Sequence, residues 1–175
     1  PQITLAGNVI ADNTLTMTQG IVNLGGFTVT LGSAATASTL TRTASTTTNW
    51  VYGGTFTRYW LNATAITSTS GNYYGLFPVG QSGASSYSPL QINSTANPTA
   101  DGSFSVTFTP AGSAGTDLSP FYNDAGTNIE YIVNGSFATT VSGVTGGTYN
   151  IDATMTGLNS TGALSDIRLA IFTGG

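Results

Sequence analysis

The strongest constraint on this chain is an alternation of apolar and polar residues with a period of two. Segments such as Thr14-Leu15-Thr16-Met17-Thr18 and Phe27-Thr28-Val29-Thr30-Leu31 alternate without a break. Because neighbouring side chains point to opposite faces of a strand, this pattern predicts strands with one buried face. No segment combines the caps and the 3.6-residue apolar period of a helix. The sequence therefore predicts an all-β fold.

Glycine residues divide the first part of the chain into short strands of nearly equal length. Gly7, Gly20 and Gly32 lie at intervals of 13 and 12 residues. Such spacing is typical of a meander or of a few coils of a β-solenoid. In both arrangements we expect six apolar side chains to stack inward: Leu15, Met17, Phe27, Val29, Leu31 and Leu40. The outward threonines could match the lattice of ice or of a crystalline polymer, although the β propensity of Thr explains them without a ligand.

From residue 87 onward the alternating segments are longer. We expect strands at residues 90–93, 103–109, 129–134, 137–142, 148–156 and 167–173. Asn134-Gly135 is the strongest hairpin signal between them, and residues 111–127 are expected to form one long loop. Strands with one apolar face each predict a two-sheet β-sandwich, Ig-like or jelly-roll-like in type.

We therefore expect three regions along the chain. Residues 1–61 form a repetitive Thr-rich β unit, solenoid-like or a meander, which packs on a β-sandwich at residues 87–175. Residues 62–86 form a connecting stretch rich in aromatic residues, Pro and Gly. The segment Gly53-Gly54-Thr55-Phe56-Thr57-Arg58-Tyr59-Trp60 is expected at the hinge between the two units.

The composition argues against several classes of function. Charged residues make up only 6% of the chain, and there is no Lys, His or Cys. Three Arg residues cannot build the basic face that a nucleic acid needs, so no nucleic-acid partner is expected. Without His or Cys the chain has no Ser-His-Asp triad and no zinc or thiolate site of the usual kind. The seven carboxylates suggest no facing pair, so we expect the protein not to be an enzyme.

Composition also bears on where the protein works. The polar surface must come from Thr, Ser, Asn and Gly, which is common on secreted and cell-surface β proteins and favours an extracellular location. No run of about 18 apolar residues is present, so no membrane span is expected. The sequence has no signal peptide and no initiating Met, which favours a mature or excised piece of a larger product.

The chain has one cation placed between aromatic residues. Arg58 is flanked by Phe56, Tyr59 and Trp60. A lone guanidinium in this setting often stacks on a ring and bonds to loop carbonyls. These four residues are therefore predicted to form a buried structural clamp.

Four further aromatic residues, Trp50, Tyr52, Tyr73 and Tyr74, lie close to this segment in the sequence. If they are exposed, their rings are candidates for stacking on the sugar rings of a glycan. The competing interpretation is that they close the core between the two units, because large rings release much free energy when they are buried.

One acidic and amide-rich region could hold calcium, which prefers six to eight oxygen ligands. Its candidate ligands are Asp117, Asn123, Asp124 and Asn128. Their spacing is not that of an EF-hand loop. The alternative is an ordinary turn region rich in Asp and Asn. Apart from this calcium, no cofactor is expected.

Three motifs in order resemble a module of large secreted surface proteins in Bacteroidetes: Gly53-Gly54-Thr55-Phe56-Thr57-Arg58, Leu76-Phe77-Pro78-Val79-Gly80 and Tyr87-Ser88-Pro89-Leu90. Residues 20–32 are also similar, so the resemblance covers most of the chain. It implies secretion by the type IX route and a role in adhesion or surface structures. The family often has Arg in place of Ser88, and its sandwich usually continues to a Trp-bearing strand after a segment similar to residues 168–175. The resemblance implies no catalytic residues.

Together these patterns predict a non-enzymatic extracellular module of a self-assembling surface fibre or adhesin, joined end to end by strand pairing. The expected partners are copies of the chain or neighbouring repeats, and surface glycans are a further candidate. The alternative function is a carbohydrate-binding module that uses exposed aromatic residues. A third hypothesis is an accessory domain of a secreted hydrolase.

Overall fold

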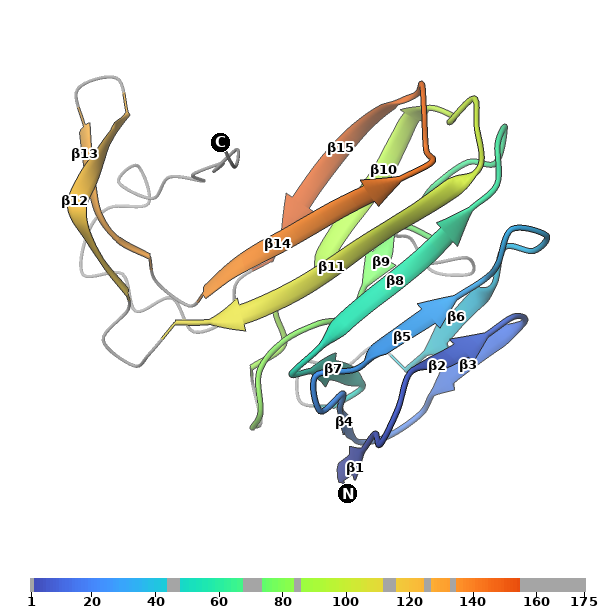
Figure 1. The fold of residues 1–175 in the computed structure, drawn as a ribbon, viewed down its shortest axis with the longest axis horizontal. Coiled ribbons are helices and arrows are strands. Elements are labelled where there is room, and N and C mark those ends of the chain that lie inside the picture. Colours follow the sequence, from blue (N-terminus) through green and yellow to red (C-terminus); the bar gives the residue numbers. More distant parts are fainter. Residues whose placement is uncertain are drawn as a thin grey trace.

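The computed structural model describes residues 2–43, 48–67, 74–83, 86–111, 116–124, 127–132 and 135–154 (Figure 1). These residues contain no helix, which confirms the all-β prediction. Their strands are β1 (Gln2–Thr4), β2 (Val9–Ala11), β3 (Thr14–Met17), β4 (Ile21–Asn23), β5 (Thr28–Leu31), β6 (Thr39–Arg42), β7 (Trp50–Tyr52), β8 (Thr55–Trp60), β9 (Leu76–Phe77), β10 (Leu90–Ala96), β11 (Gly102–Pro110), β12 (Thr116–Asp124), β13 (Thr127–Ile132), β14 (Gly135–Ser142) and β15 (Thr148–Ala153).

The first eight strands wind as successive parallel coils. One parallel sheet contains β1, β4 and β7, a second contains β2, β5 and β8, and a third contains β3 and β6. A meander would pair neighbouring strands antiparallel, whereas a solenoid pairs each strand with the equivalent strand of the next coil. Of the two predicted arrangements for the Thr-rich unit, the strands therefore adopt the solenoid-like one.

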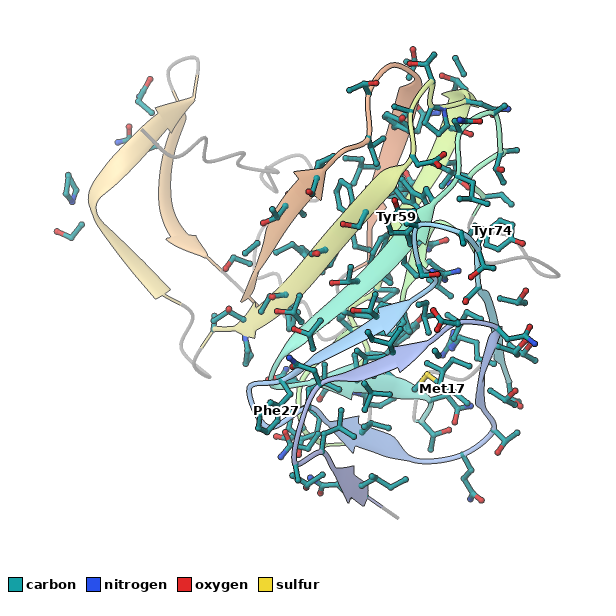
Figure 2. All side chains as sticks on the ribbon, turned by 45° about the vertical axis from the view of Figure 1, so that its right-hand side comes forward. Met17, Phe27, Tyr59 and Tyr74 are labelled. Atoms are coloured by element: carbon teal, nitrogen blue, oxygen red, sulfur yellow. The ribbon has the colours of Figure 1, made fainter. Side chains whose placement is uncertain are left out.

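Alternation places the apolar side chains inside these coils. Leu31 and Leu40 are almost fully buried, as are Val29 and Met17. Figure 2 labels Met17. Phe27 is an exception among the residues expected to stack inward, because it is 36% exposed. It lies in the turn before β5, where the strand alternation has not begun, and its side chain remains at the surface.

Two faces of the solenoid continue into the rest of the molecule. Strand β8 also pairs antiparallel with β11, and β11 pairs with β14, which gives a five-stranded sheet in the order β14-β11-β8-β5-β2. We call this the front sheet (Figure 1). Strands β15, β10 and β9 form another sheet, and Val79, just after β9, makes a parallel bridge to Val51 of β7. We call the row β15-β10-β9-β7-β4-β1 the back sheet.

The front and back sheets pack face to face on a common core. Phe77 of β9 lies with its ring centroid 6.2 Å from that of Phe56 and 5.5 Å from that of Phe104. Trp60 stacks on Tyr149 of β15 at 6.2 Å. The same buried cluster extends into the solenoid coils. The described parts of the two stretches predicted as separate units, residues 1–61 and 87–175, therefore share one sheet and one core.

Residues 111–127 are not one long loop, because β12 and β13 pair with each other antiparallel. This hairpin stands apart from the two sheets in both views (Figures 1 and 2). It is inserted between Pro110 and Gly135, which are paired directly as neighbours in the front sheet. The predicted Asn134-Gly135 hairpin is also corrected, since β14 pairs with β11. The strand expected at residues 167–173 lies outside the described residues.

Candidate functional site

Arg58 of β8 lies in the core with 1% of its side chain exposed. Its guanidinium donates through Nη2 to the carbonyl oxygen of Ser38 at 3.0 Å, and through Nη1 to that of Leu76 at 3.3 Å. The ring centroid of Tyr74 lies 5.9 Å from the guanidinium carbon, within reach of a cation–π contact. Arg58 therefore ties the loop before β6 to β9 of the back sheet, which is the geometry of the predicted clamp.

Burial changes the acidity of this guanidinium. Exclusion of water lowers the pKa of Arg58 from its ordinary value to about 9, and nearby Tyr74 opposes the shift. The side chain therefore remains mostly charged at neutral pH. Backbone carbonyls take over part of the role of the lost water, because they accept hydrogen bonds from the charged group. The arrangement links separate segments of backbone.

The three aromatic residues predicted around Arg58 divide between two faces of β8. Phe56 and Trp60 share the inward face with Arg58, and both are buried. Tyr59 lies on the opposite face because strand side chains alternate, and it is half-buried. Trp60 donates from Nε1 to the carbonyl oxygen of Tyr74 at 3.0 Å. Tyr59 is therefore not part of the clamp, and Tyr74 takes its place.

A second cation–aromatic contact was not singled out from the sequence. The guanidinium carbon of Arg42 lies 4.5 Å from the ring centroid of Tyr87, and that ring lies 5.7 Å from the ring of Trp50. Arg42 also donates from Nε to the carbonyl oxygen of Asn49 at 3.2 Å. The sequence holds no local signal for this contact, because Arg42 and Tyr87 are brought together only by the fold.

The four aromatic residues proposed to stack on glycans occupy different surroundings. Trp50 is fully buried, and its Nε1 donates to the carbonyl oxygen of Gln81 at 3.0 Å. Its ring has no face open to a sugar, which corrects the expectation for this residue. Tyr74 is half-buried beside Arg58, and Tyr73 lies outside the described residues. Tyr52 is half-buried, and its hydroxyl accepts a hydrogen bond from the Gln2 side chain.

Tyr52 lines an open groove of about 490 Å³ at the end of the front sheet where β8 begins and β11 ends. The groove is formed by Gly26 and by residues 52–55, 80–82 and 107–110. None of these residues is Asp, Glu, Lys, Arg or His. We call this feature the Tyr52 groove. Four separate segments of chain build it, so the sequence alone gave no sign of it.

The outer face of the front sheet carries rows of hydroxyl groups that run across the strands. No described strand lies in front of this face in Figure 1. Strand register places two rows side by side: Thr28, Thr55 and Thr107, and then Thr30, Thr57, Ser105 and Thr140. The hydroxyls of Thr55 and Thr107 are 2.8 Å apart, as are those of Thr57 and Ser105. The outward Thr ladder expected from the sequence thus extends beyond the solenoid.

Of the four residues proposed to bind calcium, the structure describes the side chains of Asn123 and Asn128. On the backbone, Asp117 pairs with Tyr131 and Asp124 pairs with Thr127, four residues away on β13, which separates the two positions by roughly 13 Å at about 3.3 Å per residue. Asn123 and Asn128 are exposed, and Nδ2 of Asn123 donates to Oδ1 of Asn128 at 2.9 Å. Ligands of one ion must lie within a few ångströms of a common point. This backbone spacing argues against one ion held by all four residues, and calcium binding stays a prediction because the side chains of Asp117 and Asp124 lie outside the described ones.

Large apolar side chains are exposed on the outermost strands of both sheets. Their exposed fractions are 62% for Ile3 on β1, 40% for Val9 and 66% for Ile10 on β2, 51% for Val141 on β14, and 52% for Ile151 on β15. Strands β1 and β2 lie at one end of the stacked sheets, and β14 and β15 lie at the other (Figure 1). Both ends of the described molecule therefore present apolar surface.

No protein-family model, curated protein or solved structure matches this chain. Within the described part of the chain, no helix is long and apolar enough to cross a membrane. The same residues hold no group of three or more His, Cys, Asp or Glu side chains placed to bind a metal. Function is therefore inferred from the surfaces described above.

Proposed function

We propose that the protein is a non-enzymatic structural module of an extracellular fibre or surface adhesin, and that its copies join end to end by strand pairing. The resemblance of its motifs to those of secreted surface proteins supports the extracellular location. The low content of charged residues, 6%, supports close association because little charge repulsion opposes contact between copies.

This proposal rests on inward-facing apolar side chains that are exposed on the outermost strands at the two ends. Val9, Val141 and Ile151 face inward by their strand register, yet each is at least 40% exposed. Each is paired with a buried residue of the next strand inward: Val9 with Val29, Val141 with Phe104, and Ile151 with Ile92. Within the described residues, no further strand covers them. An added strand at either end would continue the sheet and bury this apolar surface.

The strand directions at the two ends are compatible with one another. In the front sheet, β14 runs antiparallel to β11, which runs antiparallel to β8, and β8 is parallel to β5 and β2. Strands β14 and β2 therefore run in the same direction. The same reasoning through β10, β9 and the bridge to β7 shows that β15 and β1 share a direction.

A translated copy would therefore continue both sheets at the same joint. Strand β14 of one copy would lie beside β2 of the next, and β15 would lie beside β1, both as parallel pairs. Contacts of this head-to-tail kind use two different surfaces, so they generate a filament when the rotation between copies does not close a ring. The bonding would combine backbone ladders with apolar burial.

The test is to block each end separately with a charged side chain. Lysine on an edge strand discourages pairing. We expect Ile10→Lys on β2 and Val141→Lys on β14 each to weaken self-association at least about tenfold, measured by sedimentation over a range of protein concentrations. The matched control is Asn62→Lys, which adds the same charge at an exposed turn away from both ends.

A mixture of the two variants distinguishes a head-to-tail joint, which uses two different surfaces, from a symmetric joint between identical surfaces. Each Ile10→Lys copy keeps an intact β14 end, and each Val141→Lys copy keeps an intact β2 end. The mixture should therefore form pairs of unlike chains and stop there. If the unmodified chain is a monodisperse monomer at high concentration, and electron microscopy of the native material shows no filament, the proposal is wrong and a free-standing binding module becomes the better interpretation.

A further inference from the structure

We infer that neighbouring copies meet in one defined register, in which Val9 on β2 of one copy lies beside Val141 on β14 of the other and fills an apolar socket there. This inference rests on the proposed end-to-end assembly and names the contact that aligns the copies. A cavity at the β14–β15 end and the rows of paired residues that cross both sheets point to this register.

A cavity of about 70 Å³ lies between the last strands of the front and back sheets. Val141 of β14 and Ile151 of β15 line it, and each is about half exposed. Their partners on the next strands inward, Phe104 and Ile92, also line it and are buried. The cavity therefore opens toward the end of the described sheets. We call it the β14–β15 socket.

The socket suits an aliphatic side chain, because every residue that lines it is apolar or aromatic. The hydroxyl of Tyr149 is already used, since it donates to the carbonyl oxygen of Gly146 at 2.9 Å. Nε1 of Trp60 likewise donates to the carbonyl oxygen of Tyr74. An apolar cavity of about 150 Å³ holds benzene. A socket of about half that volume therefore suits one branched aliphatic side chain.

The front sheet determines which offsets between copies are acceptable. Strand pairing joins β2 to β14 through one row of inward-facing residues: Val9, Val29, Phe56, Val106 and Thr139. A copy that continued this row without an offset would place Val9 against Thr139, and the Thr139 hydroxyl would lose water to an apolar neighbour. An odd offset would pair inward-facing side chains with outward-facing ones. An offset of two residues along β14 places Val9 beside Val141.

The back sheet requires an offset for a separate reason. Strand pairing places Ile3 of β1 in the row of Val79. Val79 lies two residues beyond Phe77, whose row ends at Ala153, the last residue of β15. Without an offset, Ile3 would therefore lie past the end of β15. An offset of two residues brings it beside Ala153, which faces inward.

One displacement of the copy satisfies both sheets. Strands β14 and β15 run in opposite directions (Figure 1), so a shift toward higher residue numbers on β14 is a shift toward lower numbers on β15. The shift that brings Val9 to Val141 therefore also moves Ile3 onto β15. Val9 faces inward, because its partner within its own copy is the buried Val29. Its side chain thus lies at the open side of the socket.

The experiment uses disulfides to measure the register, because the chain has no cysteine of its own. In the variant Val9→Cys/Val141→Cys the two thiols lie at opposite ends of the front sheet, so a disulfide can only join two copies. Opposite residues on adjacent strands are about 4.8 Å apart, which a disulfide spans, whereas residues two positions along are roughly 7–8 Å apart. The matched control is Val9→Cys/Thr139→Cys, which reports a joint without the offset.

Both variants are oxidised with oxidised glutathione at a concentration at which sedimentation shows association, and are compared on a non-reducing gel. We expect Val9→Cys/Val141→Cys to give a ladder of covalent oligomers that a reductant removes, at a yield at least about tenfold above that of the control. A higher yield from the control would overturn the register while leaving end-to-end assembly in place. Association without a ladder from either variant would exclude a β2–β14 joint. If the unmodified chain does not associate at all, the assembly and this register are both wrong.

A change of side-chain size tests the filling of the socket. Val9→Ala should weaken association at least about tenfold, because the socket is left partly empty. The matched control is Ile10→Ala on the same strand, since Ile10 pairs with Thr30 and faces outward. This control should associate within about threefold of the unmodified chain. Equal effects of the two changes in sedimentation would show that Val9 does not enter the socket.

Discussion

Arg58 keeps a charge in the core, where an apolar side chain would avoid the loss of hydration. The compensation comes from two carbonyl oxygens, those of Ser38 and Leu76, and from the ring of Tyr74. Among the described residues, no backbone ladder joins the segments that contain these two carbonyls, so the guanidinium bridges them. Its role is to fix the relative position of a solenoid coil and the back sheet.

We expect Arg58→Ala to lower the free energy of unfolding by on the order of 1–3 kcal/mol, because buried carbonyl groups lose their donors. Arg58→Met should cost less, since its side chain fills more of the space while leaving the carbonyls without the same donors. Arg42→Ala is the comparison, because Arg42 is only half-buried. Urea unfolding gives all three values. An Arg58→Ala chain as stable as the unmodified one would show that the bridge does not contribute to stability.

The lowered pKa of Arg58 predicts a dependence of stability on pH. The folded chain releases this proton near pH 9, whereas the unfolded chain holds it up to the higher, ordinary pKa of arginine. Between these values the unfolded state binds more protons, so the free energy of unfolding should rise with pH. The contribution of Arg58 to the free energy of unfolding is fully present above the pKa that Arg58 has in the unfolded chain. It is lost as the pH falls through about 9.

The measurement for this prediction is the difference between the unmodified chain and Arg58→Met in urea unfolding from pH 8 to pH 10.5. The difference should shift in favour of the unmodified chain by up to about 1.4 kcal/mol per pH unit. Burial raises the pKa of Tyr149, which makes the free energy of unfolding fall as the pH rises. Tyr149 is present in both chains, so its effect cancels in the difference. A flat difference would mean that Arg58 keeps its ordinary pKa in the fold.

At the scale of elements, the period of two in the sequence predicted where strands lie and which of their faces is apolar. It did not predict which strands pair with each other. Alternation in segments such as Thr14–Met17 identifies which side chains face inward, and this is a local property. Whether such a strand pairs in parallel or antiparallel depends on residues many positions away, so the sequence left both a solenoid and a meander open. The parallel register of Leu15 with Leu40 appears only in the structure.

The difference between local preference and long-range pairing also explains why the predictions for residues 111–135 were wrong. Asn134-Gly135 favours a tight turn locally, but the partner of β14 is β11, which lies more than twenty residues earlier. Asp, Asn, Gly and Pro residues within 111–127 indicated a loop, although β12 occupies Thr116–Asp124. Turn-forming residues lower the local preference for a strand, and tertiary context overrides that preference here.

At the scale of the whole molecule, the candidate sites differ in how far the sequence could reveal them. The burial of Arg58 beside aromatic residues follows from neighbours within a few positions. The Tyr52 groove combines Gly26 with segments near residues 53, 81 and 108, so it exists only once the sheets are formed. The exposed apolar residues at the two ends of the described sheets could be predicted only in part. Alternation identifies these residues, but only the topology shows that β14 and β2 lie at opposite ends.

The composition of the joint between copies leads to a last prediction, about salt. Each copy carries a formal charge of −4, so copies repel one another weakly through solvent. The proposed joint consists of backbone ladders and apolar side chains such as Ile3 and Ile151, without ion pairs between the ends. Raising the salt to 1 M shortens the screening length to about 3 Å and removes the repulsion without weakening the joint. Association should therefore stay constant or strengthen between 0.05 M and 1 M sodium chloride, as measured by sedimentation of the unmodified chain. Dissociation at high salt would instead identify charged contacts as the main source of binding, and the strand-paired joint would be wrong.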